Sequence, residues 1–431
     1  MRHLYTIMSA CAFAVLLTAC SSGANNSFSP TAQALPASQH APSSKYAILH
    51  SFGNGNDGEG PSAPLLDVSG TLYGTTVNGG PGNQGTVFDL SASGANYNSL
   101  YSFPGNYSAG AQPNGGLVNV NGTLYGMTLY GGAGSCYAAG PNYGCGTVFS
   151  ITTGGTENVV HSFVEGSYGS TIDGIYPYGA LTYVNGTLYG QTTKGGPNSC
   201  QSDGTPYSCG TIFGISAGAS GYYAQLLAFD GSNGANPFAA LTYESGSFYG
   251  TTLCGGAYGS TYCGGGGQPG GTIFRIGFAG KEKVLHSFGN GSDGSHPLAS
   301  VIDVNGTLFG TTYDGGAYGQ GTVFSVSPGG ANYSTLYSFG STSSDGAHPA
   351  ASLLDVSGTL YGTTQFGGAY NKGTIFSIGT NGGEKLLYSF GTISNDGNTP
   401  VAALIEVGKT LYSTTNGGGA YGGGTVFSFK P

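Results

Sequence analysis

Tryptophan is absent from the chain, and charged side chains are scarce: Asp, Glu, Lys and Arg together make up 7% of its 431 residues. Arg275 is the only arginine after residue 2, and the net charge is -9. Nucleic-acid binding needs clustered Lys and Arg side chains that contact phosphates, so this composition argues against that class of partner. The lack of tryptophan argues against a quinone-cofactor dehydrogenase, and the lack of cations weakens a lyase that needs a charge-neutralising partner for its base.

Glycine and tyrosine are abundant instead, at 84 and 31 residues. Leu, Val, Ile, Phe and Tyr fall in short runs separated by Gly, Asn, Ser and Pro, a pattern typical of many short strands joined by tight turns. The composition therefore predicts an all-β protein.

One phrase recurs along the chain: Gly-Thr-Leu-Tyr-Gly-Thr-Thr, a Gly-Gly loop, and Gly-Thr-Val-Phe. A plain copy has its parts at residues 306–312, 315–316 and 321–324. Seven copies follow one another at a period of roughly 50 to 65 residues, with a degenerate seventh that begins at Thr410. The chain is therefore a repeat protein.

Each unit contains four apolar runs of strand length, which in the fifth unit are residues 300–304, 307–312, 321–326 and 335–339. Asn305-Gly306 between the first two runs is a strong signal for a two-residue type I′ hairpin. Ser-Gly or Asn-Gly occupies the same place in the other units, except the last.

The fourth run ends in Leu-His-Ser-Phe or Leu-Tyr-Ser-Phe in most units, with Val160 in place of the Leu in one unit and a divergent Leu227-Ala228-Phe229 in another. Its first copy, residues 46–52, precedes every other strand. The last unit ends after its third strand, at Phe429. Seven four-stranded units are complete only if the N-terminal run joins the C-terminal unit. This arrangement predicts a seven-bladed β-propeller over residues 45–431, with four antiparallel strands per blade and the N-terminal strand closing the last one.

The units resemble GloVer repeats, a tandem-repeat family of bacterial secreted and surface proteins with a choice of anchors, over nearly all of residues 45–431. They also look distantly like kelch repeats through their Tyr-Gly and Gly-Gly positions. The resemblance implies an exported repeat protein and brings no catalytic motif.

The N-terminus reads as a targeting segment, with an apolar stretch from Ile7 to Leu17 followed by Thr18-Ala19-Cys20. This run resembles a bacterial lipobox; an ordinary cleavable signal peptide is the alternative. We expect residues 1–19 to be a lipoprotein signal peptide, Cys20 to carry the lipid and residues 20–44 to be a Ser/Ala/Pro-rich tether. Ser21 resembles outer-membrane sorting, so we expect an extracytoplasmic outer-membrane lipoprotein that contacts the membrane only through its anchor.

Antiparallel strands place the second-to-third loops and the connections between blades on one rim. These connections carry an Asp-Gly-x-x-Pro motif, at residues 57–61, 173–177, 293–297, 345–349 and 396–400; residues 233–237 keep the pattern with Asn. The aspartates suggest a metal or glycan site, but an Asx-type turn before the next strand is the reading that we favour.

Four tyrosines of the Gly-Gly loops, Tyr258, Tyr318, Tyr370 and Tyr421, form a candidate ligand-binding rim together with His296 and His348. The tyrosines would give an aromatic platform for sugars or peptides, unless each ring packs onto its neighbouring blade. We interpret the two histidines as turn residues first. The fourth-strand histidines, His50, His161 and His286, are expected to be half-buried packing residues.

The third residue of the first strand is a carboxylate in four units: Asp67, Asp303, Asp355 and Glu406. If this strand lines the axis, the four carboxylates would face a central channel and bind a structural cation. Solvated strand ends beside a turn would have the same sequence. We predict no other cofactor and assign no metal ligand.

Six cysteines fall in three pairs of equal spacing, each within one second-to-third loop: Cys136 and Cys145, Cys200 and Cys209, Cys254 and Cys263. An exported protein is oxidised, so these pairs predict three disulfides; zinc is the weaker alternative because the thiols lack nearby His partners. The pairs would hold the insertions of blades two, three and four in shape.

We therefore expect a monomeric binding or scaffold module for a glycan or a protein at the cell envelope. An extracytoplasmic polysaccharide lyase or hydrolase is the enzymatic alternative, and a structural envelope protein without a ligand is the third. The sequence assigns no catalytic residue.

Overall fold

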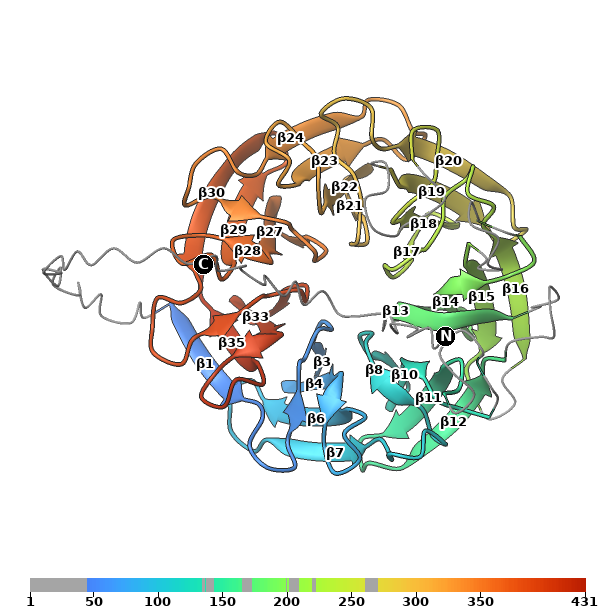
Figure 1. Ribbon diagram of the computed structural model, residues 1–431, viewed down its shortest axis with the longest axis vertical. Coiled ribbons are helices and arrows are strands. Elements are labelled where there is room, and N and C mark those ends of the chain that lie inside the picture. Colours follow the sequence, from blue (N-terminus) through green and yellow to red (C-terminus); the bar gives the residue numbers. More distant parts are fainter. Residues whose placement is uncertain are drawn as a thin grey trace, which may run out of the picture. The chain divides into compact units, whose positions relative to one another are not determined.

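The computed structural model describes residues 45–133, 136, 143–164, 173–198, 200, 209–218, 222–259 and 270–431. The predicted signal peptide and tether, with Cys20, lie outside these residues. Every regular element of the described part is a strand, and none of that part is a helix able to cross a membrane. Seven sheets of four or five strands form a ring (Figure 1). This is the predicted seven-bladed propeller.

The strands of the blades follow one another in chain order, from the axis outward. Blade one contains β3 (Leu66–Val68), β4 (Thr71–Thr76), β6 (Thr86–Ser91) and β7 (Asn98–Ser102). Blade two contains β9 (Val118–Val120), β10 (Thr123–Tyr130), β11 (Thr147–Thr152) and β12 (Glu157–Ser162), with β8 (Ala111–Pro113) also on β10. Blade three contains β13 (Gly174–Val184), β14 (Thr187–Gly195), β15 (Thr211–Ser216) and β16 (Tyr223–Ala228). Blade four contains β17 (Thr242–Glu244), β18 (Ser247–Thr252), β19 (Thr272–Gly277) and β20 (Glu282–Ser287).

The remaining blades keep this order, except that the outermost strand of blade seven is the N-terminal β1 (Tyr46–Ser51). Blade five contains β21 (Ile302–Val304), β22 (Thr307–Thr312), β23 (Thr322–Val326) and β24 (Ser334–Ser338). Blade six contains β26 (Leu354–Val356), β27 (Thr359–Thr364), β29 (Thr374–Gly379) and β30 (Gly382–Ser389). Blade seven contains β32 (Ile405–Val407), β33 (Thr410–Thr415), β35 (Thr425–Phe429) and β1 (Tyr46–Ser51). Three short pairs join inter-blade segments to Gly-Gly loops: β2 (Gly58–Glu59) with β5 (Asn78–Gly79), β25 (Gly346–Ala347) with β28 (Phe366–Gly367), and β31 (Gly397–Asn398) with β34 (Gly417–Gly418).

The N-terminal strand closes the ring. β1 pairs antiparallel with β35, from Tyr46 opposite Phe429 to Ser51 opposite Thr425, and Figure 1 shows the two strands side by side in blue and red. Tyr46 also stacks on Tyr388 of the preceding blade, with ring centroids 4.2 Å apart. The predicted closure is confirmed.

Two rings of phenylalanines join the blades. The Phe that follows each fourth strand packs on the third-strand Phe of the next blade, with centroids 5.0–5.3 Å apart. All fourteen side chains are fully buried. The repeated glycine of the second strand makes room for them, because a Cβ on Gly310 would lie 2.5 Å from Phe324 Cζ. The Ser-Phe and Gly-Thr-Val-Phe phrases therefore build the core between blades.

A buried pair of threonines joins the second and third strands in every blade, with Oγ1 atoms 2.7–2.9 Å apart. In blade five, Thr312 Oγ1 bonds Thr322 Oγ1 and also donates to the backbone oxygen of Asp314. Because Thr312 is fully buried, this network supplies hydrogen-bond partners at the start of the Gly-Gly loop. The repeated threonines thus fix the base of each loop.

The two-residue turns have left-handed backbone at both positions, as type I′ requires; Asn305 and Gly306 have φ of 54° and 79°. The first strand is shorter than predicted, starting at Ile302 instead of residue 300. The reason is that Ser300 forms hydrogen bonds with the two neighbouring blades instead of with β22. Its hydroxyl donates to Ala240 O of blade four, and its backbone N–H donates to Ser352 Oγ of blade six. The hairpin turns form one rim, the hairpin rim, and the Gly-Gly loops with the inter-blade segments form the other, the loop rim.

Candidate functional site

The aspartates of the Asp-Gly-x-x-Pro segments organise the loop rim. Asp396, 6% exposed, accepts hydrogen bonds from Tyr388 Oη (2.7 Å), Gly391 N (2.7 Å) and Gly397 N (2.8 Å). Asp345 likewise accepts hydrogen bonds from Tyr337 Oη and from the backbone N–H groups of Gly340 and Gly346. Each aspartate therefore joins its turn to the fourth strand, which is the turn arrangement that the sequence favours.

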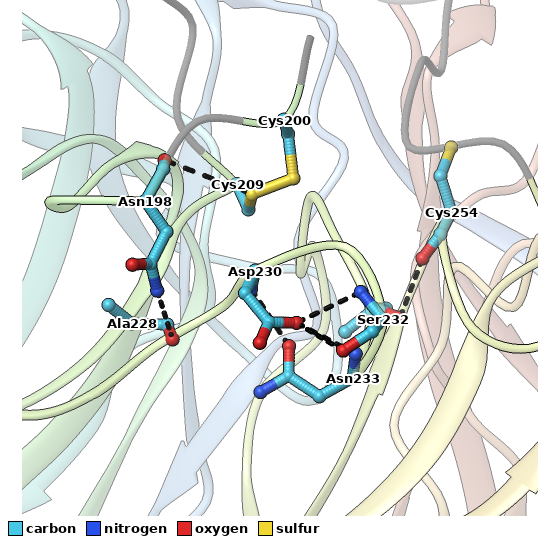
Figure 2. Close-up of a disulfide and its surroundings, with 9 residues drawn as sticks. Asn198, Cys200, Cys209, Ala228, Asp230, Ser232, Asn233 and Cys254 are labelled. Atoms are coloured by element: carbon cyan, nitrogen blue, oxygen red, sulfur yellow. Dashed lines mark hydrogen bonds between the residues drawn. A yellow bond between two sulfur atoms is a disulfide. The ribbon is translucent and has the colours of Figure 1, made fainter.

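At the junction between blades three and four, an aspartate also accepts hydrogen bonds from its turn, but it stands at another position (Figure 2). Asn233 replaces the aspartate, and Asp230 accepts from Ser232 N, Ser232 Oγ and Asn233 N at 2.7–3.1 Å. The bond from the Ser232 hydroxyl is the main cause of a lowered pKa of Asp230. Sequence reasoning missed Asp230 because it lies three residues before the expected position.

A second set of residues that sequence reasoning missed lies six positions before each fourth-strand Phe. Around the ring this position alternates between Tyr and Glu: Tyr97, Glu157, Tyr223, Glu282, Tyr333, Glu384 and Tyr46. Tyr97 and Tyr333 stack on histidines of the preceding blade, His50 and His286, with 3.8 Å between centroids. The glutamates Glu157 and Glu384 instead bond the tyrosines Tyr101 and Tyr337 of the preceding blade.

These pairs are visible in the sequence as a correlation between neighbouring units. A fourth-strand His is followed in the next unit by Tyr at the position six residues before the Phe, and a fourth-strand Tyr is mostly followed there by Glu. The histidines are half-buried, as expected, but each also meets an aspartate: His50 Nε2 lies 2.8 Å from Asp57 Oδ2, and His286 Nε2 lies 2.9 Å from Asp293 Oδ2. His161 Nε2 lies 3.4 Å from Asp173 Oδ2.

The pKa of the Glu384 carboxyl is strongly raised. Burial raises its pKa, the negative charge of Asp345 adds to the rise, and a hydrogen bond from Tyr337 opposes it; the result is a pKa of about 7. The folded protein therefore holds a proton on Glu384 at pH values where the unfolded chain, with a pKa near ~4.3, has lost it.

We expect Glu384→Gln to make the protein more stable than the wild type at pH 8. The folded pKa is raised, so the wild type loses stability as pH rises from about 4.3 to about 7, and the amide removes this loss. Since the carboxyl is only half-buried, solvent screening reduces the effect to on the order of 1 kcal/mol. Urea unfolding at pH 4.5 and pH 8 measures it, with the exposed Glu244→Gln as control; equal pH dependence of wild type and Glu384→Gln would contradict the assignment.

The four loop tyrosines are more than half exposed: Tyr258 by 52%, Tyr318 by 56%, Tyr370 by 55% and Tyr421 by 58%. Each ring therefore presents a surface to solvent, and its role in binding stays a prediction. Their loops are anchored, since the preceding alanine N–H donates to the fourth-strand serine in two blades, Ala317 to Ser338 and Ala369 to Ser389. Exposed tyrosines thus lie at the same loop position in four consecutive blades, and this bond anchors the loops of Tyr318 and Tyr370.

Two hollows lie on the loop rim beside these tyrosines. The first, of about 700 Å³, lies between blades seven and one and is lined by His50, Asn54, Asp57, Tyr97 and Tyr421, among others. Tyr97 Oη donates to Asp57 Oδ1, and the His50 ring lies parallel to Tyr97. This hollow combines aromatic surfaces with hydrogen-bonding groups that are held in place.

The second hollow, of about 360 Å³, lies between blades four and five and is lined by Tyr258, His286, Asn290 and Asp293, among others. Both volumes fall in the range of small-molecule sites, roughly 300–1,000 Å³. Sequence reasoning named the tyrosines but did not place them with the fourth-strand histidines, which lie far away in sequence.

His296 and His348 have left-handed backbone, with φ of 54° and 56°, which agrees with their interpretation as turn residues. Both also contact Asp314 of the intervening Gly-Gly loop: His296 Nδ1 lies 2.9 Å from Oδ2 and His348 Nδ1 3.1 Å from Oδ1. Burial alone would raise the pKa of Asp314, but the two histidines outweigh it and lower the pKa to about 2. Asp314 therefore ties three loop-rim segments together.

The first-strand carboxylates cap their own turns. Asp67, Asp303 and Asp355 accept the N–H of the glycine three residues later, each at 2.9 Å. This geometry is that of the solvated strand end, and a channel cation held by these residues and Glu406 stays a prediction. Within the described ranges, no group of three or more His, Cys, Asp or Glu side chains is arranged to hold a metal ion.

Two of the predicted disulfides are present, Cys136–Cys145 and Cys200–Cys209, with Cα atoms 5.1 and 5.2 Å apart. Asn198 Nδ2 donates to Ala228 O and ties the second loop to the fourth strand (Figure 2). Closing loops of this size contributes about 2.5 kcal/mol each in the chain-entropy model. Cys263 lies outside the described residues, so the pairing with Cys254 stays a prediction.

Several solved structures match most of the chain at low sequence identity. A computationally designed protein, Ika8, has a TM-score of 0.47 and 13% identity, covering 88% of this chain and 98% of its own. A puromycin-hydrolysing peptidase of Mycobacterium tuberculosis has a TM-score of 0.49 and 10% identity, covering 82% and 50%. An oligogalacturonate lyase in complex with manganese has a TM-score of 0.47 and 12% identity, covering 84% and 86%.

Sequence comparison gives a narrower result. No curated protein sequence matches the chain. The Gloeobacter/Verrucomicrobia repeat matches residues 38–205 and 199–427, which together span almost the whole propeller. The resemblance to GloVer repeats is thereby confirmed, and the chain belongs to the Gloeobacter/Verrucomicrobia repeat family.

Proposed function

We propose that the protein is a binding module of the cell envelope, and that its loop rim binds a neutral glycan. The observation that carries this proposal is the equal exposure of Tyr258, Tyr318, Tyr370 and Tyr421 at one loop position in consecutive blades. Soluble proteins seldom leave a series of large aromatic side chains exposed without a binding role. Tyrosine offers an apolar ring for the C–H face of a sugar and a hydroxyl for its polar edge.

The charges on this rim favour a neutral ligand. Both hollows contain an aspartate, Asp57 or Asp293, and the chain carries a net charge of -9. An anionic polymer would be repelled by this field. Asn54 and Asn290 add amide donors and acceptors, which suit hydroxyl groups.

The place where the chain enters the ring suits an anchored module. Lys45, which precedes β1, accepts a hydrogen bond from Lys430 N at 2.7 Å on the hairpin rim. A tether over residues 20–44 that carries a lipid on Cys20 would therefore join the propeller at the hairpin rim. On this proposal the protein is an extracytoplasmic outer-membrane lipoprotein that binds its ligand as a monomer.

We expect the Ala variant of all four loop tyrosines to lose retention on the neutral polysaccharide that retains the wild type, by at least about tenfold in affinity. The measurement is affinity chromatography on immobilised cellulose, mannan and starch, with released sugars assayed in parallel. The exposed Tyr222→Ala, outside the loop rim, is the control. Released sugars would identify a hydrolase or lyase, and equal retention of the wild type and the four-fold variant would refute the tyrosine rim.

A further inference from the structure

The two hollows are built from almost the same sequence. Residues 49–58 and 285–294 both read Leu-His-Ser-Phe-Gly-Asn-Gly-x-Asp-Gly and differ only where Ser292 replaces Asn56. The Leu-His-Ser-Phe-Gly-Asn-Gly stretch occurs nowhere else in the chain. The following blades also share a tripeptide, Ala-Asn-Tyr, that ends in Tyr97 and in Tyr333. These shared segments distinguish the two junctions from the other five.

The His–Asp contact and the His–Tyr stack have the same geometry at the two junctions. The His–Asp contacts are 2.8 and 2.9 Å, and both histidines lie on their tyrosines at 3.8 Å with an interplanar angle of 2°. An exposed loop tyrosine borders each hollow, Tyr421 in the first and Tyr258 in the second. Both hollows are thus lined by one His, one Asp, one loop Tyr and an Asn at the same repeat position, Asn54 or Asn290, and Tyr97 adds a second tyrosine to the first hollow alone. The shared residues offer the same groups to a ligand.

We propose that one molecule binds two like sugar units, one in each hollow, and is thus bivalent for a repeating neutral polysaccharide. This inference rests on the proposed function and adds the number and place of its sites. His161 is not counted as a third site, because its blade lacks the Leu-His-Ser-Phe-Gly-Asn-Gly stretch.

The ring holds the two sites at a fixed separation. Four blades lie between them on one path and three on the other, so β1 and β20 occupy opposite sides of the ring (Figure 1). Binding at the first site raises the local concentration of polymer at the second, which strengthens overall binding by 10²–10⁴-fold when the ligand spans both sites. A single sugar unit gains nothing from this arrangement. Two sites with low affinity for a single sugar unit would therefore give a high affinity for the polymer.

The test uses the polysaccharide that retains the protein and its hexasaccharide, which is cellohexaose, mannohexaose or maltohexaose. We expect calorimetry to find two equal hexasaccharide sites per wild-type chain. Tyr421→Ala and Tyr258→Ala are each expected to leave one site with unchanged affinity, and to weaken polymer binding by on the order of 100-fold. The double variant is expected to bind neither probe.

The control is Tyr222→Ala, a change at an exposed tyrosine outside the loop rim. Tyr222 borders neither hollow, so two hexasaccharide sites are expected to remain. Loss of all hexasaccharide binding in one single variant, with no change in the other, would refute bivalency and leave the proposed function standing. No retention of the wild type on any polymer would refute both.

Discussion

Deletion of residues 45–52 is expected to destabilise the whole ring, by on the order of 10 kcal/mol, or to abolish its cooperative unfolding transition. The deletion removes β1, which pairs with β35, and Phe52, which packs on Phe88 of blade one. Loss of one buried Phe side chain alone costs about 3–5 kcal/mol. Tyr46, 6% exposed, and the backbone pairs of β1 add to the loss. Thermal unfolding followed by circular dichroism measures the effect.

A deletion of similar length within residues 25–40 is the control, and we expect it to leave the melting temperature unchanged. A synthetic peptide of residues 45–53, added in excess to the shortened protein, is expected to restore part of the stability, because it binds only the folded ring. Unchanged melting of the shortened protein would show that the ring does not depend on β1.

Asp396→Ala is expected to lower the free energy of unfolding by about 3–5 kcal/mol, because it leaves buried hydrogen-bond donors unpaired. Asp396 is buried, and its removal leaves the Tyr388 hydroxyl and the N–H groups of Gly391 and Gly397 without their acceptor. Each buried donor that loses its partner costs about 1–3 kcal/mol. Denaturant unfolding at neutral pH measures the loss.

Asp355→Ala is the matched control, since this carboxylate accepts one bond, from Gly358 N, in an exposed turn. We expect a loss below about 1 kcal/mol there. Similar losses in the two variants would mean that the aspartates of the Asp-Gly-x-x-Pro segments do not hold the loop rim together.

The architecture could be predicted from the sequence because its determinants are local and repeated. Strand runs, Asn-Gly turns and the displaced first copy of the fourth strand each lie within one unit, and the closure by β1 followed from counting strands. The packing partners of the buried side chains were harder to predict from the sequence. The packing of Phe288 on Phe324, for example, joins two units, and nothing within either unit identifies the partner.

The candidate site was only partly predictable for the same reason. Tyr421 was identified by its repeated loop position, and its exposure agrees with a role on the surface. Its neighbours in the first hollow, His50 and Tyr97, come from the opposite end of the chain and from the next blade. Asp314 was not identified from the sequence, because its structural role depends on contacts with His296 and His348, which lie in the inter-blade segments on either side of it.

The alternation of Tyr and Glu before the fourth-strand Phe has a consequence for how such a ring can change. A fourth-strand His packs on a Tyr of the next blade, and a fourth-strand Tyr mostly bonds a Glu of the next blade. If one blade exchanged places with the blade after it, His161 or His286 would face a glutamate instead of its tyrosine. Moving a pair of blades preserves every junction within it. Because seven is odd, the pattern cannot close, and two tyrosines, Tyr46 and Tyr97, follow each other at the seam beside β1. The unit that can be copied, lost or exchanged without mismatch is therefore two blades, although the sequence repeats with one.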